Sequence, residues 1–190
     1  MSKHTTVIRS FLALAAFALL LNGCKEEENP ATPPVDDEHA PPTTMVVVLK
    51  EAGKTDSTKS LVRDTTVIKG KAMVEDTLRI ASGKTYSGYI VLYDESKTPV
   101  ENATQEIIDD QDSHLFVFTP GGGANGRVTV SGLNKDTKGG DFGLTFSVTV
   151  SGTGAANGTL QVRLRHYGGN PKTSATYDTD IDQTFPVVIR

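Results

Sequence analysis

The chain has 190 residues, of which 37% are hydrophobic, 6% aromatic and 22% charged, and its formal net charge is −4. An acidic chain without a basic cluster is a poor binder of nucleic acid, so we expect no nucleic-acid partner. Cys24 is the single cysteine, which excludes an internal disulfide.

The first 23 residues have the pattern of a secretory signal peptide. Lys3 and Arg9 provide basic charge, and an uninterrupted apolar run covers residues 11–21. As a helix, this run would extend about 16 Å, roughly half of the hydrocarbon core of a bilayer. We therefore predict a signal peptide that is cleaved, not a membrane span.

The quartet Leu21-Asn22-Gly23-Cys24 resembles the bacterial lipobox, in which a peptidase cuts before an acylated cysteine. Two or three acyl chains, such as palmitate, give stable anchoring, so we predict that Cys24 attaches the protein to membrane lipid. Residues 25–28, one lysine and three glutamates, resemble the export signal of surface lipoproteins of the Bacteroidota. The alternative is a solvated start to a linker. We expect an outer-membrane location at the cell surface, with the periplasmic face as the alternative.

Residues 24–44 are predicted to be an extended, disordered tether. Five of the nine prolines lie in residues 26–44, among many charges and few apolar side chains. Loss of Lys3 and Arg9 with the signal peptide lowers the basic count from 19 to 17 against 23 acids, so the net charge of the mature chain is −6. Residues 45–190 have the usual length of one domain.

This domain has the pattern of an all-β protein. Apolar and polar residues alternate at 145–150, 160–164 and 185–189, which is typical of half-buried strands. Further strands are predicted at 45–50, 65–68, 76–80, 86–93, 114–119 and 127–131. Glycine-rich turns separate the strands, and one helical turn is expected within 100–108. We predict an antiparallel, immunoglobulin-like β-sandwich in which Pro186 marks a sheet edge.

Two motifs carry little chemistry. Residues 121–126 have the glycine spacing of a phosphate loop, but Arg127-Val128 stands where lysine and serine or threonine are required, so we expect a hairpin turn. Asp178, Asp180 and Asp182 alternate as calcium ligands can. The rest of a calcium-binding motif is missing, and we favour a solvated loop that leads into the last strand.

Two histidines are the candidate metal ligands. His114 is in phase with Phe116 and Phe118, and His166 is in phase with the apolar residues of 160–164, so each is expected to cap the inward face of a strand. Together with Asp112 or Glu106 they could bind a soft or borderline divalent metal. The alternative is two rim histidines whose ring nitrogens bond to backbone groups.

The sequence does not predict an enzyme. It has no serine in a nucleophile elbow, the one cysteine is assigned to lipid, and no histidine has a recognisable acid or nucleophile beside it. The spacing of carboxylates along the chain does not place a pair across a cleft.

Four segments, TYSGYIVLYDES (85–96), PVENATQEIIDDQDSHLFVF (99–118), GTLQVRLRH (158–166) and TDIDQTFPVVI (179–189), resemble small lipoproteins of the Bacteroidota. That group is often labelled type 1 periplasmic binding fold superfamily. The label implies a large α/β fold, whereas the strand pattern here predicts an all-β domain, and we follow the strand pattern. The resemblance implies an accessory role beside an outer-membrane TonB-dependent receptor, and histidines recur in the group at the positions of His114 and His166.

Three tripeptides beginning at Asp56, Asp64 and Asp76 resemble the O-glycosylation signal of exported proteins in the Bacteroidota. The attachment sites implied are Ser57, Thr65 and Thr77. Taken together, we expect a non-catalytic binding accessory to a TonB-dependent uptake system, related to a divalent metal. The alternative is a structural or adhesive surface module without a small ligand.

Overall fold

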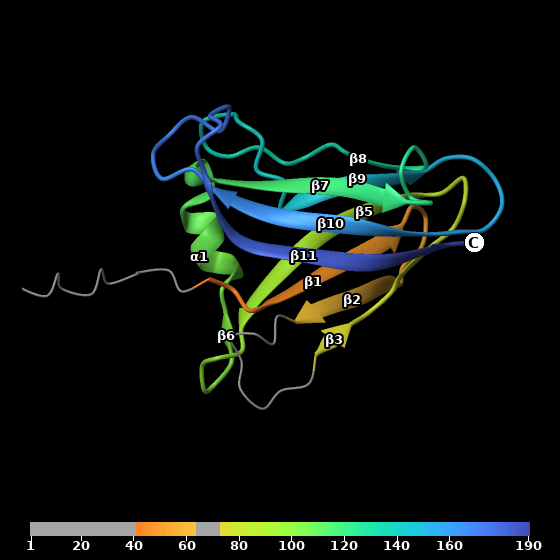
Figure 1. Cartoon of the computed structure of the whole chain (residues 1–190), viewed down its shortest axis with the longest axis horizontal. Helices are drawn as coiled ribbons and strands as arrows, with labels where there is room; N and C mark the ends of the chain where they lie inside the picture. Colours follow the sequence, from red (N-terminus) through yellow and green to blue (C-terminus); the bar gives the residue numbers. More distant parts are fainter. Residues whose placement is uncertain (1–40, 64–72) are drawn as a thin grey trace, which may run out of the picture. The chain divides into compact units, whose positions relative to one another are not determined.

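Two β-sheets face each other across a hydrophobic core in the computed structural model, which describes residues 41–63 and 73–190 (Figure 1). The strands are β1 (Thr44–Glu51), β2 (Ser57–Arg63), β3 (Val74–Glu75), β4 (Leu78–Ile80), β5 (Thr85–Asp94), β6 (Glu101–Asn102), β7 (His114–Gly122), β8 (Val128–Ser131), β9 (Thr145–Val150), β10 (Ala156–His166) and β11 (Asp178–Ile189). One α-helix, α1 (Thr104–Asp109), and a 3-10 helix, Gln111–Ser113, precede β7.

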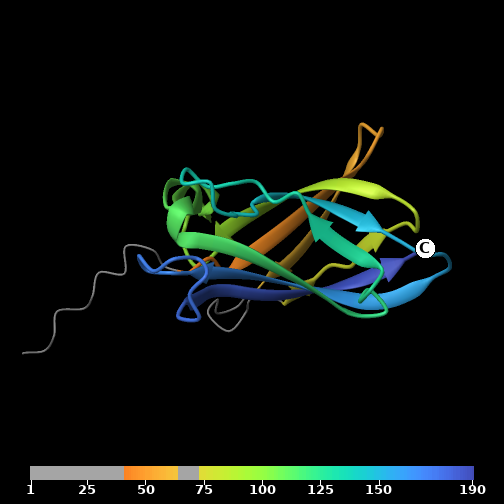
Figure 2. The same cartoon turned by 90° about the horizontal axis from the view of Figure 1, so that it is seen from above.

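Sheet A has the strand order β3-β2-β1-β5-β9-β8, with β6 paired to β5, and sheet B has the order β4-β11-β10-β7. The pairings between the described strands are antiparallel, except that β4 runs parallel to β11. This arrangement confirms the predicted all-β antiparallel sandwich. Figures 1 and 2 show α1 at the end of the sandwich where β7 begins and β10 ends, opposite the C-terminus.

The alternating segments became strands because each buries one row of apolar side chains between the sheets. Phe146, Val148 and Val150 of β9 are buried, and so are Leu160, Val162 and Leu164 of β10. At roughly 1.5–3 kcal/mol for each large apolar side chain removed from water, these rows are the main driving force for packing the sheets together.

Strand β1 is buried on both faces. Met45, Val47 and Leu49 enter the core, while Val46 and Val48 are buried on the outer face of sheet A. Their cross-strand neighbours there lie on β2 and β5, which flank β1 along its length. A continuous apolar run is therefore the correct pattern for this central strand.

The sequence missed β2 and β3, and the predicted strand at 65–68 lies outside the described residues. In β2 the buried residues are Ser60 and Val62, a signal too short and too polar to indicate a strand. Within the described residues β11 pairs with β10 alone as far as Pro186, and β4 joins it from Val187 onward. Pro186 therefore stands at a sheet edge, as predicted.

The signal peptide, Cys24 and most of the tether lie outside the described residues, so their assignments stay predictions. The sandwich itself begins with β1 at Thr44, one residue before the predicted boundary. Among the residues that the structure describes, no helix has the length and apolar character needed to cross a membrane.

Candidate metal centre

The two predicted histidines meet in space. His114 is the first residue of β7 and His166 the last of β10, and the antiparallel register places them directly opposite each other. Directly paired residues share one face of a sheet. Here the shared face is the inner one, and the imidazole rings stack with centroids 4.7 Å apart and planes 13° from parallel.

Asp110 brings a carboxylate to the same place. It follows α1, and the 3-10 helix after it leads directly into His114. Its Oδ2 atom lies 3.6 Å from Nδ1 of His114 and 3.8 Å from Nε2 of His166. The Ser113 hydroxyl donates a hydrogen bond of 3.1 Å to the other carboxylate oxygen, Oδ1. One donor atom from each of these three residues lies within 4.8 Å of the others.

A second carboxylate, that of Asp180, orients His114 from the opposite side. The β10–β11 register pairs Leu164 with Ile181 but Arg165 with Thr179, so Asp180 is the extra residue of a β-bulge. Such bulges redirect a side chain. Oδ2 of Asp180 accepts a hydrogen bond from Nε2–H of His114 at 3.0 Å. A carboxylate on one ring nitrogen fixes the tautomer that leaves the other nitrogen available to a metal.

His114 is enclosed, whereas the other two members of the centre lie at the rim. The side chain of His114 is 3% exposed, compared with 32% for His166 and 40% for Asp110. Nδ1 of His114 also lies 2.9 Å from the backbone oxygen of Asp110. Both of its ring nitrogens therefore face oxygen acceptors. Both acceptors are satisfied if each nitrogen carries a proton, or if a cation takes the place of the proton on Nδ1.

The donor set suits a transition metal. Tetrahedral zinc with bonds of about 2.0–2.1 Å separates its ligands by about 3.3 Å. The Asp110 carboxylate lies 3.6 and 3.8 Å from the two ring nitrogens and all three donors lie within 4.8 Å of one another, so the group would have to contract to hold the ion. The stacked rings of His114 and His166 would have to tilt relative to each other for both to hold one cation. Two imidazoles and one carboxylate fit zinc, nickel or copper better than calcium or magnesium.

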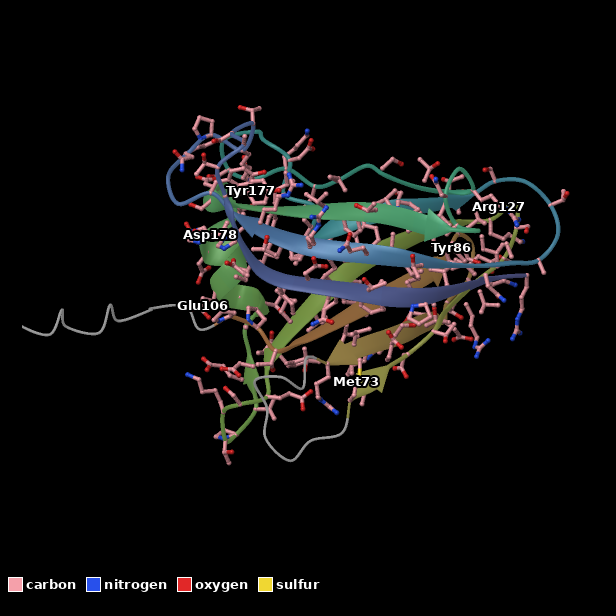
Figure 3. All side chains as sticks on the ribbon, viewed as in Figure 1. Met73, Tyr86, Glu106, Arg127, Tyr177 and Asp178 are labelled. Carbon is pink, nitrogen blue, oxygen red and sulfur yellow. The ribbon has the colours of Figure 1, made fainter. Side chains whose placement is uncertain are left out.

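The acids expected beside the histidines were predicted wrongly. Asp112 turns away and accepts the Thr137 hydroxyl at 2.7 Å, with the Lys138 ammonium at 3.5 Å. The hydrogen bond from Thr137 lowers the pKa of this carboxyl below its ordinary value. Glu106 lies in α1 (Figure 3) and is not one of the grouped donors among the described residues. The sequence pattern could not have identified Asp110 and Asp180. Asp110 reaches the histidines because α1 ends there, and Asp180 does so because it is the extra residue of a β-bulge.

The aspartates at 178, 180 and 182 belong to β11 and not to a loop, which corrects the prediction. Asp178 stands opposite His166, Asp180 bonds to His114, and Asp182 accepts Nε2–H of Gln161 at 2.8 Å. Within the described chain they do not converge as a metal-binding group.

The glycine-rich segment at 121–126 does form a turn, but not that of a hairpin. β7 pairs with β10 and β8 pairs with β9, so this turn carries the chain from sheet B to sheet A. Of the predicted glycosylation sites, Ser57 is exposed at the start of β2 and Thr77 is half-buried before β4. Thr65 lies outside the described residues.

Beside the metal centre, the Lys172 ammonium forms a separate ionic cluster. Its Nζ atom lies 2.7 Å from Oδ2 of Asp136 and donates to the backbone oxygens of Gln111 at 2.7 Å and Asp141 at 2.9 Å. The hydrogen bond from Lys172, together with those from backbone N–H groups, lowers the pKa of Asp136 although burial opposes this. Since Gln111 belongs to the 3-10 helix, the cluster fixes the segment that connects Asp110 to His114.

No protein-family model, no curated protein and no solved structure matches this chain. The fold and the site define an antiparallel β-sandwich with a two-histidine, one-carboxylate centre at its helical end. The immunoglobulin-like topology and the resemblance to lipoproteins of the Bacteroidota stay predictions.

Proposed function

We propose that the protein is a lipid-anchored outer-membrane protein whose sandwich binds a divalent transition metal through Asp110, His114 and His166. The observation that supports this most is the convergence of three candidate ligands from separate parts of the chain. Asp180 accepts a hydrogen bond from Nε2 of His114, which leaves Nδ1 facing Asp110. Three protein ligands leave at least one tetrahedral position free. Water or a ligand from a partner protein can occupy that position, so the metal can be passed on.

The role we propose is that of a non-catalytic accessory to a TonB-dependent uptake system. The support for it is the resemblance of the strand segments to surface lipoproteins and the lipobox at Cys24. A site with an exposed rim, formed by His166 and Asp110, suits capture and transfer of a metal better than permanent retention. The predicted location is the cell surface, with the periplasmic face as the alternative.

A structural or adhesive surface module is the second candidate, and one contact favours it. The 2.9 Å bond from Nδ1 of His114 to the backbone oxygen of Asp110 satisfies that nitrogen without metal. With Asp180 on the other nitrogen, a protonated His114 would be a structural clamp between α1 and β11.

Metal titration of the full-length chain in detergent separates the two candidates. We expect isothermal titration calorimetry to detect one Zn²⁺ site, and His166→Ala to weaken it by at least about tenfold, since loss of a ligand costs more than loss of an outer partner. His166 is the better position to vary than His114 because its side chain is 32% exposed, compared with 3% for His114, so its loss is expected to disturb the fold less.

The matched control is His39→Ala, which removes a histidine of the predicted tether and should leave the affinity unchanged. Absence of Zn²⁺ binding, or equal binding by wild type and His166→Ala, would establish the structural clamp instead.

The accessory role is tested by in-cell crosslinking of the tagged full-length protein followed by mass spectrometry. We expect recovery of a TonB-dependent receptor, and its loss in Cys24→Ala because that variant lacks the predicted anchor. Recovery of lipid and scattered membrane proteins alone would reject the uptake role and leave the surface module.

A further inference from the structure

A groove of about 930 Å³ lies on the outer face of sheet A. Its floor is formed by Ser87 and Tyr89 of β5 and by Thr145 and Ser147 of β9. The turn between β1 and β2 borders one side and α1 another. Figure 2 shows the β1–β2 turn, in orange, projecting beyond the two sheets.

The lining of this groove differs in charge from the rest of the molecule. The chain contains 23 acidic residues, yet no aspartate or glutamate lines the groove, and Lys50 is its charged residue. Within the described part of the chain, no carboxylate lies within 4.0 Å of the Lys50 ammonium. A ligand with one negative charge would therefore meet a complementary cation here, and no carboxylate in the lining itself.

The remaining groups suit a polyhydroxylated ligand. The Tyr89 side chain is an exposed aromatic residue, with 44% of its surface accessible. Among the described residues, no hydrogen-bond partner occupies the Tyr89 phenol or the hydroxyls of Ser57, Thr145 and Ser147. An aromatic side chain presents an apolar body with a polar tip, which matches a sugar ring that has an apolar C–H face and hydroxyl edges.

From this chemistry we propose that the groove binds an acidic oligosaccharide. One sugar ring packs on Tyr89, and the carboxylate of a uronic acid pairs with Lys50. Lys50 pairs with Ser87 in the strand register and lies two positions from Tyr89 along the same face. Diagonal neighbours of this kind lie about 7–8 Å apart, within reach of a lysine side chain.

Oligosaccharide binding is independent of the proposed metal function, since none of Asp110, His114 and His166 lines the groove. Binding is therefore measured in the presence of EDTA on the full-length chain in detergent. The probes are oligogalacturonate and its methyl ester, which share one sugar backbone but differ in charge.

Calorimetry is expected to show binding of oligogalacturonate and at least about tenfold weaker binding after Tyr89→Ala, as loss of an aromatic contact implies. Tyr89→Phe keeps the ring and should retain most of the affinity. Lys50→Gln should abolish the preference for the acid over the ester. Lys59→Gln is the matched control. Lys59 lies on β2, on the same outer face of sheet A as Lys50 but outside the groove, so this substitution should leave the preference for the acid unchanged.

Three results would each overturn the proposal: no binding of oligogalacturonate, equal binding of acid and ester by the wild type, or an affinity unaffected by Tyr89→Ala. Thermal unfolding of each variant checks that the fold is retained, which is expected because Tyr89 and Lys50 are exposed.

Discussion

Two clusters of acidic side chains lie beside the same 3-10 helix, Gln111–Ser113, and differ in the basic side chains that face them. In one, the carboxylate of Asp136 holds the Lys172 ammonium at 2.7 Å. In the other, Asp110 and Asp180 face the imidazoles of His114 and His166. Among the described residues, no lysine or arginine pairs with Asp110 or Asp180.

The difference separates a structural joint from a candidate binding centre. A lysine has a permanent charge near neutral pH and cannot be exchanged, so the cluster around Lys172 is complete within the fold. An imidazole is charged only when protonated, and as a neutral ring it is a metal ligand. The candidate metal centre thus lacks a lysine or arginine partner among the described residues and is where a cation from outside would fit, whereas the Lys172 cluster contains its own cation.

The largest effect is expected from Lys172→Met, which leaves the Asp136 carboxylate buried without its partner. The side chains of Lys172 and Asp136 are only 13% and 3% exposed. Removal of one member of a buried ion pair costs about 3 kcal/mol in the free energy of unfolding, which urea denaturation would measure. If Lys172→Met unfolds at the wild-type urea concentration, the cluster is not a structural joint.

Asp180→Asn tests the metal centre without removing a ligand. The amide can turn its NH₂ group toward His114 and favour the wrong tautomer, so we expect Zn²⁺ affinity to fall by about 10–100-fold, as for other outer partners of metal-bound histidines. Calorimetry with Asp182→Asn as the control measures this, because Asp182 bonds to Gln161 and not to a histidine. Equal losses in both variants would show a general effect of charge.

The lowered pKa of Asp136 predicts a dependence of stability on pH. The folded state binds the proton less readily than the unfolded state, whose pKa is near 3.8. The resulting stabilisation is complete above that value and is lost as pH falls through the lower pKa of the folded state. Urea unfolding from pH 6 to pH 2 should show a smaller acid-side loss for Asp136→Asn than for wild type. Parallel curves would contradict the shift.

The smallest effect is expected from Lys135→Met. Lys135 pairs with Asp141 at 2.7 Å, but both side chains are more than half exposed. Solvent-exposed pairs contribute about 0.2–1 kcal/mol, and salt screens them. Its urea midpoint should therefore stay close to that of wild type, which makes it the surface counterpart of Lys172→Met. A loss of stability as large as that of Lys172→Met would show that solvent exposure does not determine how much these ion pairs contribute to the free energy of unfolding.

The strands could be predicted from sequence wherever one face is apolar and the other polar, as at 145–150 and 160–164. The alternation also placed His114 and His166 on the inward face, since each continues an apolar row. Their meeting depends on the register between β7 and β10, which links residues 52 positions apart. Asp110 and Asp180 depend on a helix end and on a bulge, and neither leaves a periodic signal.

The position of β1 between β2 and β5 has a mechanical consequence. Thr44, its first residue, is paired on one side with Arg63 and on the other with Tyr93. A pull on Thr44 along the axis of β1 would have to break the hydrogen bonds to β2 and β5 together, because both neighbours pair with β1 along its length. A domain held from its N-terminal side against flow is thus loaded through its most deeply buried strand.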